Sequence, residues 1–231
     1  EINEATVRLL TRLGIEIVVA QGAGCCGSLV HHMGKEAQSH QQAKANIDAW
    51  SRELAGEGLD AIVITASGCG TTVKDYGHML RHDRNYAAKA AKISDLACDV
   101  TEYLAGIDVP ADRFAGATHG GARVAYPSAC SMQHGQKIIR EPRDLLKKAG
   151  YEVLEIAEGH LCCGSAGVYN LLQPEIAGKL RDRKLGNIRN TAPDLVATGN
   201  IGCMVQLETD ALKVVHTVQL LDWAAGGPTP E

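Results

Sequence analysis

The chain has 231 residues, a formal net charge of −4 and only 4% aromatic residues. This length can bury a substantial core as one large or two small domains. No long run of basic or acidic residues occurs, which argues against nucleic acid or an anionic membrane surface as a partner. No apolar run reaches the roughly 18 residues that a membrane-spanning helix needs. The sequence shows no secretory signal pattern, so a reducing cytoplasmic compartment is expected.

The first half of the chain alternates helical and strand patterns. Apolar residues recur at helical spacing over 2–13, 34–55, 71–81 and 86–105. Short apolar runs at 15–20 and 61–65 predict buried strands. Residues 106–121 contain Gly, Pro, Asp and a His-Gly-Gly sequence, a composition typical of a linker.

The second half repeats this plan. Strands are predicted at 123–126, 151–156, 195–198 and 213–216, and helices at 131–149, 166–172, 174–190, 204–212 and 217–225. Alternating strands and helices predict an α/β fold with a mostly parallel sheet in each half. We therefore expect a first repeat over 1–105, a linker over 106–121 and a second repeat over 122–231.

The chain contains eight cysteines, and the word Cys-Cys-Gly-Ser occurs twice. It begins at Cys25 and again 137 positions later at Cys162. Neighbouring cysteines cannot easily form a disulfide with each other, because their Cα atoms lie too close together. Two adjacent thiolates followed by glycine instead suit a metal site at a tight turn. The repeated word indicates an internal duplication around such sites.

The remaining cysteines also follow predicted strands. Cys130 and Cys203 come just after two strands of the second half, and Cys162 and Cys163 follow a third. The carboxyl ends of strands in an open parallel sheet form the usual ligand-binding edge. Three strand ends would therefore bring these four cysteines to one edge of one sheet.

The first half carries Cys25, Cys26 and Cys69 but no counterpart of Cys130. An exact duplication would put the missing cysteine about eight positions before Glu1, after a strand that is also missing. The helix at 2–13 would then correspond to the helix at 131–149. We therefore expect the first repeat to be truncated at its N-terminus, and the chain to be a fragment.

Several motifs resemble a known family. They are Thr65-Ala66-Ser67-Gly68-Cys69-Gly70, His160-Leu161-Cys162-Cys163-Gly164-Ser165-Ala166-Gly167 and Asn200-Ile201-Gly202-Cys203. The pattern is similar to the cysteine-rich CCG domain of iron–sulfur subunits, such as heterodisulfide reductase B and lactate-utilisation proteins. The resemblance is strongest to the iron–sulfur subunits of glycolate oxidase (glycolate dehydrogenase). It extends over nearly the whole chain, but the N-terminal ferredoxin module of such subunits is missing.

The resemblance implies which residues bind the cofactor. They are Cys130, Cys162, Cys163 and Cys203, with Cys25, Cys26 and Cys69 as further metal ligands. Heterodisulfide reductase motifs end in Cys-x-x-Cys, whereas Cys69 is followed by Gly-Thr-Thr and Cys203 by Met-Val-Gln. This departure argues against a five-cysteine non-cubane cluster and fits a four-cysteine site for a 4Fe–4S cluster.

The function that the resemblance implies is electron transfer in a 2-hydroxy-acid oxidase complex, most simply glycolate oxidase. A flavin subunit would take electrons from glycolate, and this chain and a ferredoxin-like module would pass them toward quinone. The complex would attach peripherally to the inner membrane. We see no catalytic residues for glycolate oxidation in the chain itself.

Other interpretations remain open at this stage. Four thiolates suit zinc as well as iron, so a zinc-stabilised structural or assembly module is one alternative. A thiol/disulfide redox subunit like heterodisulfide reductase is another. The cysteines could also be buried structural residues, which is our expectation for Cys98. The letters Gly22-x-Gly24-x-x-Gly27, with Asp48 downstream, also match a dinucleotide fingerprint.

Three histidines lie beside the cysteine motifs. They are His31, His32 and His134. A histidine near such a site can serve as a ligand or a proton relay. We instead expect these side chains to be solvated or to cap helices.

Overall fold

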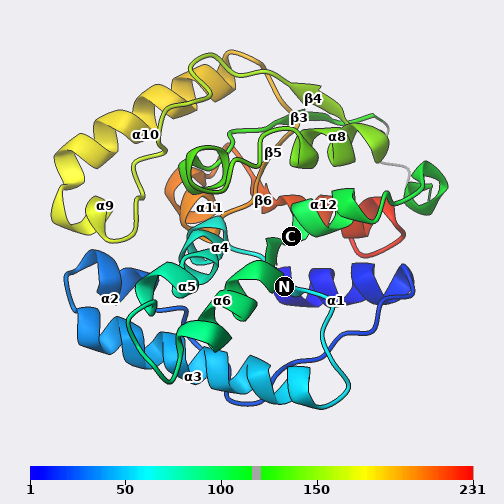
Figure 1. Cartoon of the computed structure of the whole chain (residues 1–231). Coiled ribbons are helices and arrows are strands. Elements are labelled where there is room, and N and C mark those ends of the chain that lie inside the picture. Colours follow the sequence, from blue (N-terminus) through cyan, green and yellow to red (C-terminus); the bar gives the residue numbers. More distant parts are fainter. Residues whose placement is uncertain (116–120, 231) are drawn as a thin grey trace. The chain divides into compact units, whose positions relative to one another are not determined.

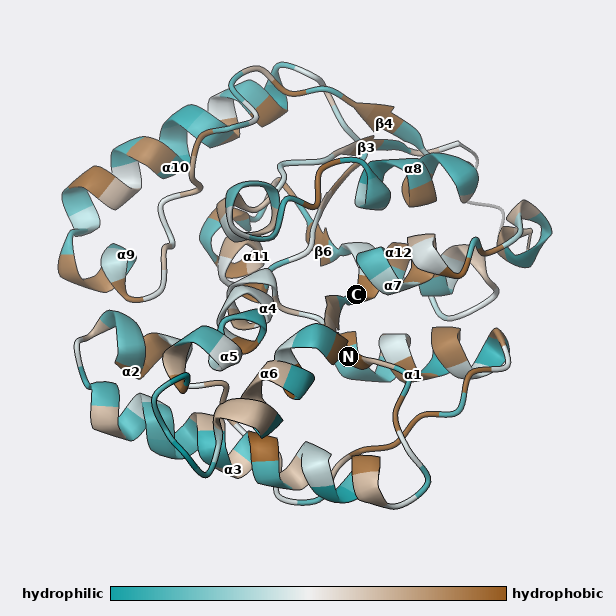
Figure 2. Ribbon diagram, viewed as in Figure 1, coloured by the Kyte–Doolittle hydropathy of each residue, from teal (hydrophilic) through white to brown (hydrophobic). Residues whose placement is uncertain are grey.

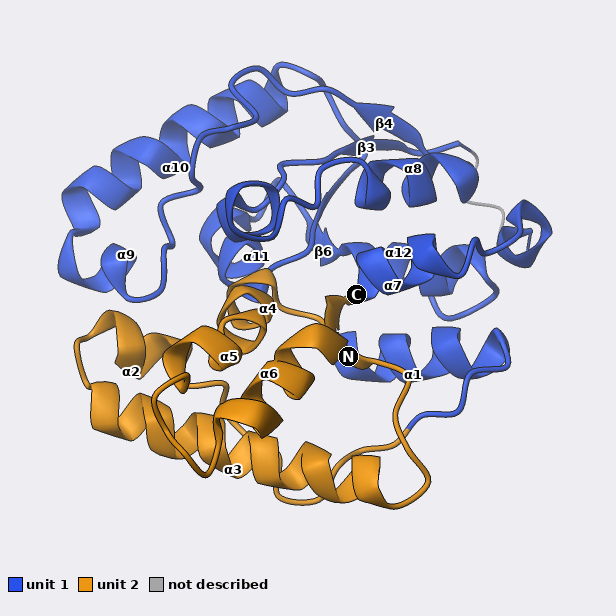
Figure 3. Ribbon diagram, in the orientation of Figure 1, with its two compact units in different colours: residues 1–17, 100–231 blue, residues 18–99 orange. Residues whose placement is uncertain are grey.

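The computed structural model describes residues 1–115 and 121–230. It is an α/β structure with two sheets, and every pair of neighbouring strands within them is parallel (Figure 1). The chain divides into two compact units, residues 18–99 and residues 1–17 with 100–231 (Figure 3). The expected α/β class with two parallel sheets is therefore confirmed.

The larger unit is built on a four-stranded sheet in the order β4-β3-β5-β6. Its strands are β3 (Arg123–Ala125), β4 (Glu152–Leu154), β5 (Leu195–Thr198) and β6 (Val214–His216). Val196, Ala197 and Thr198 follow one another in β5 and are all fully buried. Successive residues of a strand point to opposite faces, so both faces of this sheet are covered.

Helices of the larger unit provide that cover. They are α1 (Ile2–Arg12), α7 (Val100–Gly106), α8 (Glu141–Lys148), α9 (Tyr169–Leu172), α10 (Pro174–Arg189), α11 (Ile201–Leu207) and α12 (Thr217–Ala224). Hydrophilic and hydrophobic bands alternate along α10, as expected for a helix with one buried face (Figure 2). Its Leu185 and Ile188 join one core cluster with Val196 of β5, Leu207 of α11 and Val214 of β6.

The smaller unit has a two-stranded sheet formed by β1 (Ile62–Ile64) and β2 (Ala97–Asp99). Its helices are α2 (Ser28–His32), α3 (Glu36–Ala55), α4 (Ser67–Lys74), α5 (Tyr76–Met79) and α6 (Ala87–Leu96). Ile47, Tyr76 and Ile93 are fully buried in its core. The Tyr76 ring stacks on Trp50 of α3 with ring centroids 6.5 Å apart.

The same order of elements recurs in the two sheets. β1 pairs in parallel with β2, which leads directly into α7, and β5 pairs in parallel with β6, which leads directly into α12. Both β1 and β5 are followed by a helix that begins three residues after the strand ends, α4 after β1 and α11 after β5. The compact units do not follow the sequence repeats, because α1 and α7 belong to the larger unit.

Three local expectations are wrong. Residues 15–20 form no strand, and Val19 is 85% exposed. The expected helix over 86–105 is interrupted by β2, so Cys98 lies in a strand, where its thiol faces the Ile62 carbonyl oxygen. The expected helix over 131–149 is a π-helical turn (Ser131–Gln136) and then α8, separated by Lys137 in a left-handed conformation.

Proline explains part of that last break. Pro142 lies in the first turn of α8, where its missing N–H costs nothing, but it would remove a hydrogen bond from the interior of a longer helix. The expected linker over 106–121 lies partly outside the described residues. Within it, Ala111–Phe114 form a short 3-10 helix.

Candidate functional site

The second cysteine set lies at the carboxyl-terminal ends of three neighbouring strands of the four-stranded sheet. Cys130 follows β3 and precedes the π-helical turn, Cys162 and Cys163 lie in the loop after β4, and Cys203 lies in the first turn of α11 after β5. All four thiols belong to the larger unit. The topology therefore brings together residues that are up to 73 positions apart in the sequence.

The sulfur atoms form two close pairs. The Cys163 thiol donates to the Cys203 sulfur at 3.2 Å, and the Cys130 thiol to the Cys162 sulfur at 4.0 Å. The Gly164 amide donates a further hydrogen bond to the Cys162 sulfur at 3.3 Å. Cys163 and Cys203 are buried, and no cysteine among the described residues forms a disulfide.

Hydrogen bonding divides the four thiols into donors and acceptors. The pKa of Cys162 is lowered mainly by the hydrogen bond from Cys130, and that of Cys203 by the one from Cys163. The pKa of Cys130 is raised mainly by its hydrogen bond with Cys162, and that of Cys163 by hydrogen bonds with Cys162 and Cys203, with burial adding to both. Cys162 and Cys203 are therefore the two sulfurs of the set that carry negative charge most readily.

Side chains near the cysteines tie the three loops together. Gln133, from the turn after Cys130, donates to the Gly159 carbonyl oxygen at 3.3 Å. Asn200 caps α11 by accepting from the Gly202 amide at 2.9 Å, and its amide group donates to the Ser131 hydroxyl at 3.4 Å. These bonds fix the loops of Cys130, Cys162 and Cys203 relative to one another.

Glycine is required after each cysteine pair. Gly27 and Gly164 have φ angles of +86° and +94°, a region that other residues rarely adopt. A Cβ atom built on Gly164 would lie 2.4 Å from the Ala177 carbonyl oxygen. The backbone of α10 therefore approaches the Cys-Cys-Gly loop so closely that only glycine fits.

The first cysteine set lies in the smaller unit. The Cys26 and Cys69 side chains share a hydrogen bond, which raises the pKa of Cys26 and lowers that of Cys69. Cys25 is exposed. Cys69 occupies the first turn of α4 after β1, as Cys203 occupies the first turn of α11 after β5.

Two residues without an assigned role in the sequence fix the first loop. Asn46 of α3 accepts from the Gly24 amide at 2.7 Å and donates to the Cys25 carbonyl oxygen at 3.1 Å. The Tyr76 hydroxyl donates to the Cys26 carbonyl oxygen at 2.8 Å. Asn46 and Tyr76 are almost fully buried, so the loop is anchored from inside the core.

The remaining sequence candidates lie outside these clusters. His31, His32 and His134 are exposed, and His32 contacts Ser28 at 3.2 Å. The dinucleotide fingerprint requires a strand before Gly22, and the described structure has none there. No helix among the described residues is long and apolar enough to cross a membrane.

A family profile described as a cysteine-rich domain, CCG, matches residues 1–74 and 124–208. The chain belongs to the CCG cysteine-rich domain family. The two matched segments contain both Cys-Cys-Gly-Ser words together with Cys69, Cys130 and Cys203.

Curated relatives of this CCG chain include subunits of oxidoreductases. It is 39% identical over 223 residues to the glycolate oxidase iron-sulfur subunit of Escherichia coli, covering 96% of this chain and 54% of the relative. It is 32% identical to a probable glycolate oxidase iron-sulfur subunit of Bacillus subtilis, covering 98% and 52%. It is 26% identical to lactate utilization protein A of a Geobacillus strain, covering 95% and 92%. The chain thus spans about half the length of the two glycolate oxidase relatives.

Proposed function

We propose that this CCG chain holds an iron–sulfur cluster at Cys130, Cys162, Cys163 and Cys203 and passes electrons within a 2-hydroxy-acid oxidase complex, with glycolate as the substrate. The observation that carries the proposal is the gathering of four thiols from three strand ends at one sheet edge. The names of the two glycolate oxidase relatives support the assignment of iron–sulfur chemistry.

The donor chemistry fits such a cluster. All four groups are thiols, the ligands that iron–sulfur clusters take from proteins. The described residues contain no group of three or more cysteine, histidine or acidic side chains placed to bind a single metal ion. A 4Fe–4S cluster instead spreads its four thiolates over four irons, so a set of paired sulfurs is compatible with it.

The bound cluster would supply one-electron oxidation and reduction. The protein's part is to bind it and tune its potential. The Gly164 amide donates to the Cys162 sulfur, and burial of Cys163 and Cys203 excludes water from that side of the site. Hydrogen bonds to sulfur and solvent exclusion are two of the factors that set the potential of an iron–sulfur centre.

Cys25, Cys26 and Cys69 form a second proposed metal site. These three thiols are one short of the four that a complete cluster site uses. We assign the two sets to two copies of one ancestral repeat, 1–105 and 122–231 with 106–121 between them, and the first copy lacks its first strand and first cysteine. The recurring order of parallel pair and helix supports this duplication.

The proposed partners follow from the relatives. A flavin-containing subunit would deliver electrons from glycolate, a ferredoxin-like module would relay them, and quinone at the inner membrane would accept them. We place this chain in the cytoplasm, and it would be attached to the inner membrane only through the other subunits of its complex. In this proposal the chain oxidises no glycolate by itself.

The experiment is anaerobic purification of the full chain, followed by iron, acid-labile sulfide and zinc analysis. About four irons and four sulfides per chain are expected for one cluster, and Cys163→Ser should lose them. Cys98→Ser is the matched control and should keep them, because Cys98 lies in β2 and belongs to neither cysteine set. Stoichiometric zinc without sulfide would replace the proposal with a zinc-stabilised module.

One observation favours a second candidate function. The Cys163 and Cys203 sulfurs are 3.2 Å apart and carry opposite pKa shifts, a pairing that suits thiol/disulfide exchange. A metal-free chain in which these two residues form a disulfide reversibly under a defined thiol buffer would support that function. Mass spectrometry of the oxidised and reduced chains would identify the bond.

A further inference from the structure

Lys184 of α10 is a buried lysine that binds the loop carrying Cys162 and Cys163 of the second cysteine set. Its side chain is only 2% exposed. Its ammonium donates to the Gly159 carbonyl oxygen at 3.1 Å and to the Leu161 carbonyl oxygen at 2.5 Å. Both carbonyls belong to the loop that leads to Cys162. Lys184 therefore fixes the backbone just before the Cys-Cys pair from the buried side of the loop.

Burying a lysine is costly unless something compensates its charge. Lys184 forms no ion pair with a carboxylate among the described residues. Burial lowers its pKa, and the charges that raise the pKa again are the thiolates of Cys163, Cys203, Cys162 and Cys130. The ammonium binds the carbonyl oxygen of Leu161, the residue before Cys162, so this buried cation lies beside the backbone of the cysteine set.

The first cysteine set has a neutral residue in the corresponding place. Asn46 lies 21 positions after Cys25, and Lys184 lies 22 positions after Cys162, each on the long helix that follows its Cys-Cys-Gly loop. Asn46 also binds the backbone of its loop, at Gly24 and Cys25. Each loop is thus anchored through its backbone by a residue of a following helix, with a neutral side chain at the first set and a positively charged one at the four-thiol set.

We propose that Lys184 is a positioning residue that compensates the negative charge of the four-thiolate site and thereby strengthens cofactor binding and raises its reduction potential. This inference rests on the proposed function for the identity of the cofactor. Four thiolates make an iron–sulfur centre an anion, and reduction adds one more negative charge. A nearby buried cation stabilises the reduced form more than the oxidised form, because its field is weakly screened there.

The test compares Lys184→Met with Lys179→Met in the anaerobically purified full chain. Methionine keeps much of the length of lysine but removes the charge and the two hydrogen bonds. Lys179 lies on the same helix, but its side chain is 73% exposed and pairs with Glu175. We expect Lys184→Met to have a more negative reduction potential and to lose iron to a chelator at least about threefold faster, with Lys179→Met unchanged.

Two further variants separate charge from packing. Lys184→Arg keeps the charge and should keep the potential close to that of the parent chain. Lys184→Gln removes the charge but keeps a donor for the loop, and it replaces Lys184→Met if that variant fails to fold. A loaded Lys184→Gln or Lys184→Met chain with the parental potential and the parental rate of iron loss would overturn the inference.

The experiment also separates failure of this inference from failure of the proposed function. If the parent chain contains zinc and no sulfide, the iron–sulfur assignment fails, and zinc affinity against a competing chelator becomes the measurement. Charge compensation still predicts weaker zinc binding by Lys184→Gln, because four thiolates around Zn²⁺ also leave a net negative site. Equal zinc affinity, or a parent chain that binds neither metal, overturns the role of Lys184.

Discussion

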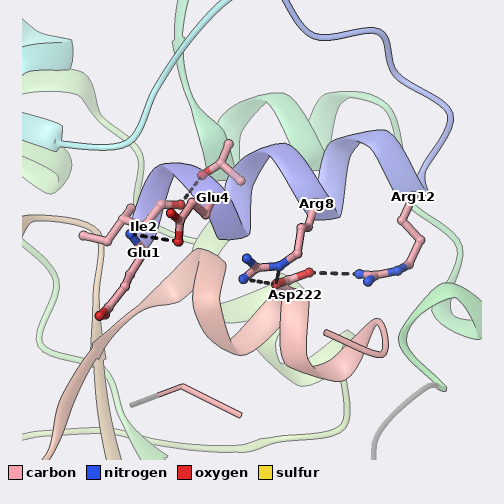
Figure 4. Close-up of polar contacts among 7 residues, drawn as sticks. Glu1, Ile2, Glu4, Arg8, Arg12 and Asp222 are labelled. Carbon is pink, nitrogen blue, oxygen red and sulfur yellow. Dashed lines mark hydrogen bonds and ion pairs between the residues drawn. The ribbon is translucent and has the colours of Figure 1, made fainter. Parts of the chain in front are cut away.

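Arg8 binds the Asp222 carboxylate through two nitrogens, Nε and a terminal guanidinium nitrogen, each 2.8 Å from Oδ2. Arg12, one turn further along α1, binds the other carboxylate oxygen at 2.9 Å (Figure 4). The Asp222 side chain is 1% exposed, whereas those of Arg8 and Arg12 are 39% and 38% exposed. Two arginine side chains that reach solvent thus bind both oxygens of a buried carboxylate, and these ion pairs hold α1 against α12.

Replacing Asp222 with alanine should lower the free energy of unfolding by about 2 to 3 kcal/mol, because hydrogen bonds to a charged group and a packed side chain are lost together. Chemical denaturation gives the measurement. Asp182→Ala is the matched control, since Asp182 is an exposed helical aspartate of α10 and should change stability by no more than about 0.5 kcal/mol. Equal stability of the two variants would contradict a structural role for the α1–α12 ion pairs.

Alanine at position 164 should destabilise the larger unit by about 2 to 4 kcal/mol, because the left-handed backbone and the contact with the Ala177 carbonyl oxygen both oppose a Cβ atom. Gly178→Ala is the control within α10. A Cβ atom there meets no atom within 4 Å, so this change should stabilise the chain by about 0.5 to 1 kcal/mol. Thermal unfolding of both variants would reveal opposite shifts, and shifts of the same sign would refute the close approach of α10 to the loop.

Tyr76→Phe removes the hydroxyl that binds the Cys26 carbonyl oxygen and receives the Asn46 amide, both in the buried interior. An unsatisfied buried carbonyl costs about 1 to 3 kcal/mol, so we expect a loss of that size in the smaller unit. Hydrogen exchange of the amides in α3 and α4 should report the loss locally. Tyr169→Phe is the control and should have little effect, because the Tyr169 hydroxyl makes no hydrogen bond among the described residues. An equal loss of stability in Tyr76→Phe and Tyr169→Phe would argue against the Tyr76 anchor.

The parallel strands and the placement of cysteines at their carboxyl ends could be predicted from the sequence. Short β-branched runs such as 195–198 were bounded by turn residues, and the repeated Cys-Cys-Gly word fixed the correspondence between the halves. That combination is enough to predict that Cys130, Cys162 and Cys203 lie at one edge of the sheet.

The segment 15–20 could not be predicted from its composition alone. It has the apolar, β-branched character of a strand, but a strand needs a partner. In the proposed duplication it corresponds to β4, which pairs with β3, and no described strand pairs with 15–20. Residues 97–99 show the opposite case. Their sequence pattern predicts a helix, but they form a strand that pairs with β1. Tertiary pairing decided both cases.

The cysteines could be chosen from the sequence, but their supporting residues could not. Lys184 lies in a helix rich in lysine and arginine, and only the tertiary structure shows that it alone among them is buried behind the thiols. The sequence likewise gives no role to Asn46 or Tyr76. A signal was available for Lys184, because it lies 22 residues after the Cys-Cys pair as Asn46 lies 21 residues after the first.

Stability should fall in alkaline solution because of two buried tyrosines. Burial raises the pKa values of Tyr151 and Tyr76 above the usual value, and the Tyr151 hydroxyl donates to the Leu220 carbonyl oxygen at 3.0 Å. From about pH 10 upward the unfolded chain loses these protons while the folded chain retains them, so the unfolded state binds fewer protons and the free energy of unfolding decreases. The loss continues until the pH reaches the raised pKa values of the folded state.

Tyr151→Phe separates this effect from ordinary packing. At neutral pH the variant should lose about 1 kcal/mol with its hydrogen bond to α12. Between about pH 10 and pH 11.5 its stability should decline less steeply than that of the parent chain, because one group that keeps its proton in the folded chain is gone. Urea denaturation at a series of pH values measures both quantities. Parallel pH profiles for the parent and the variant would mean that the Tyr151 hydroxyl ionises in the folded chain as readily as in the unfolded one.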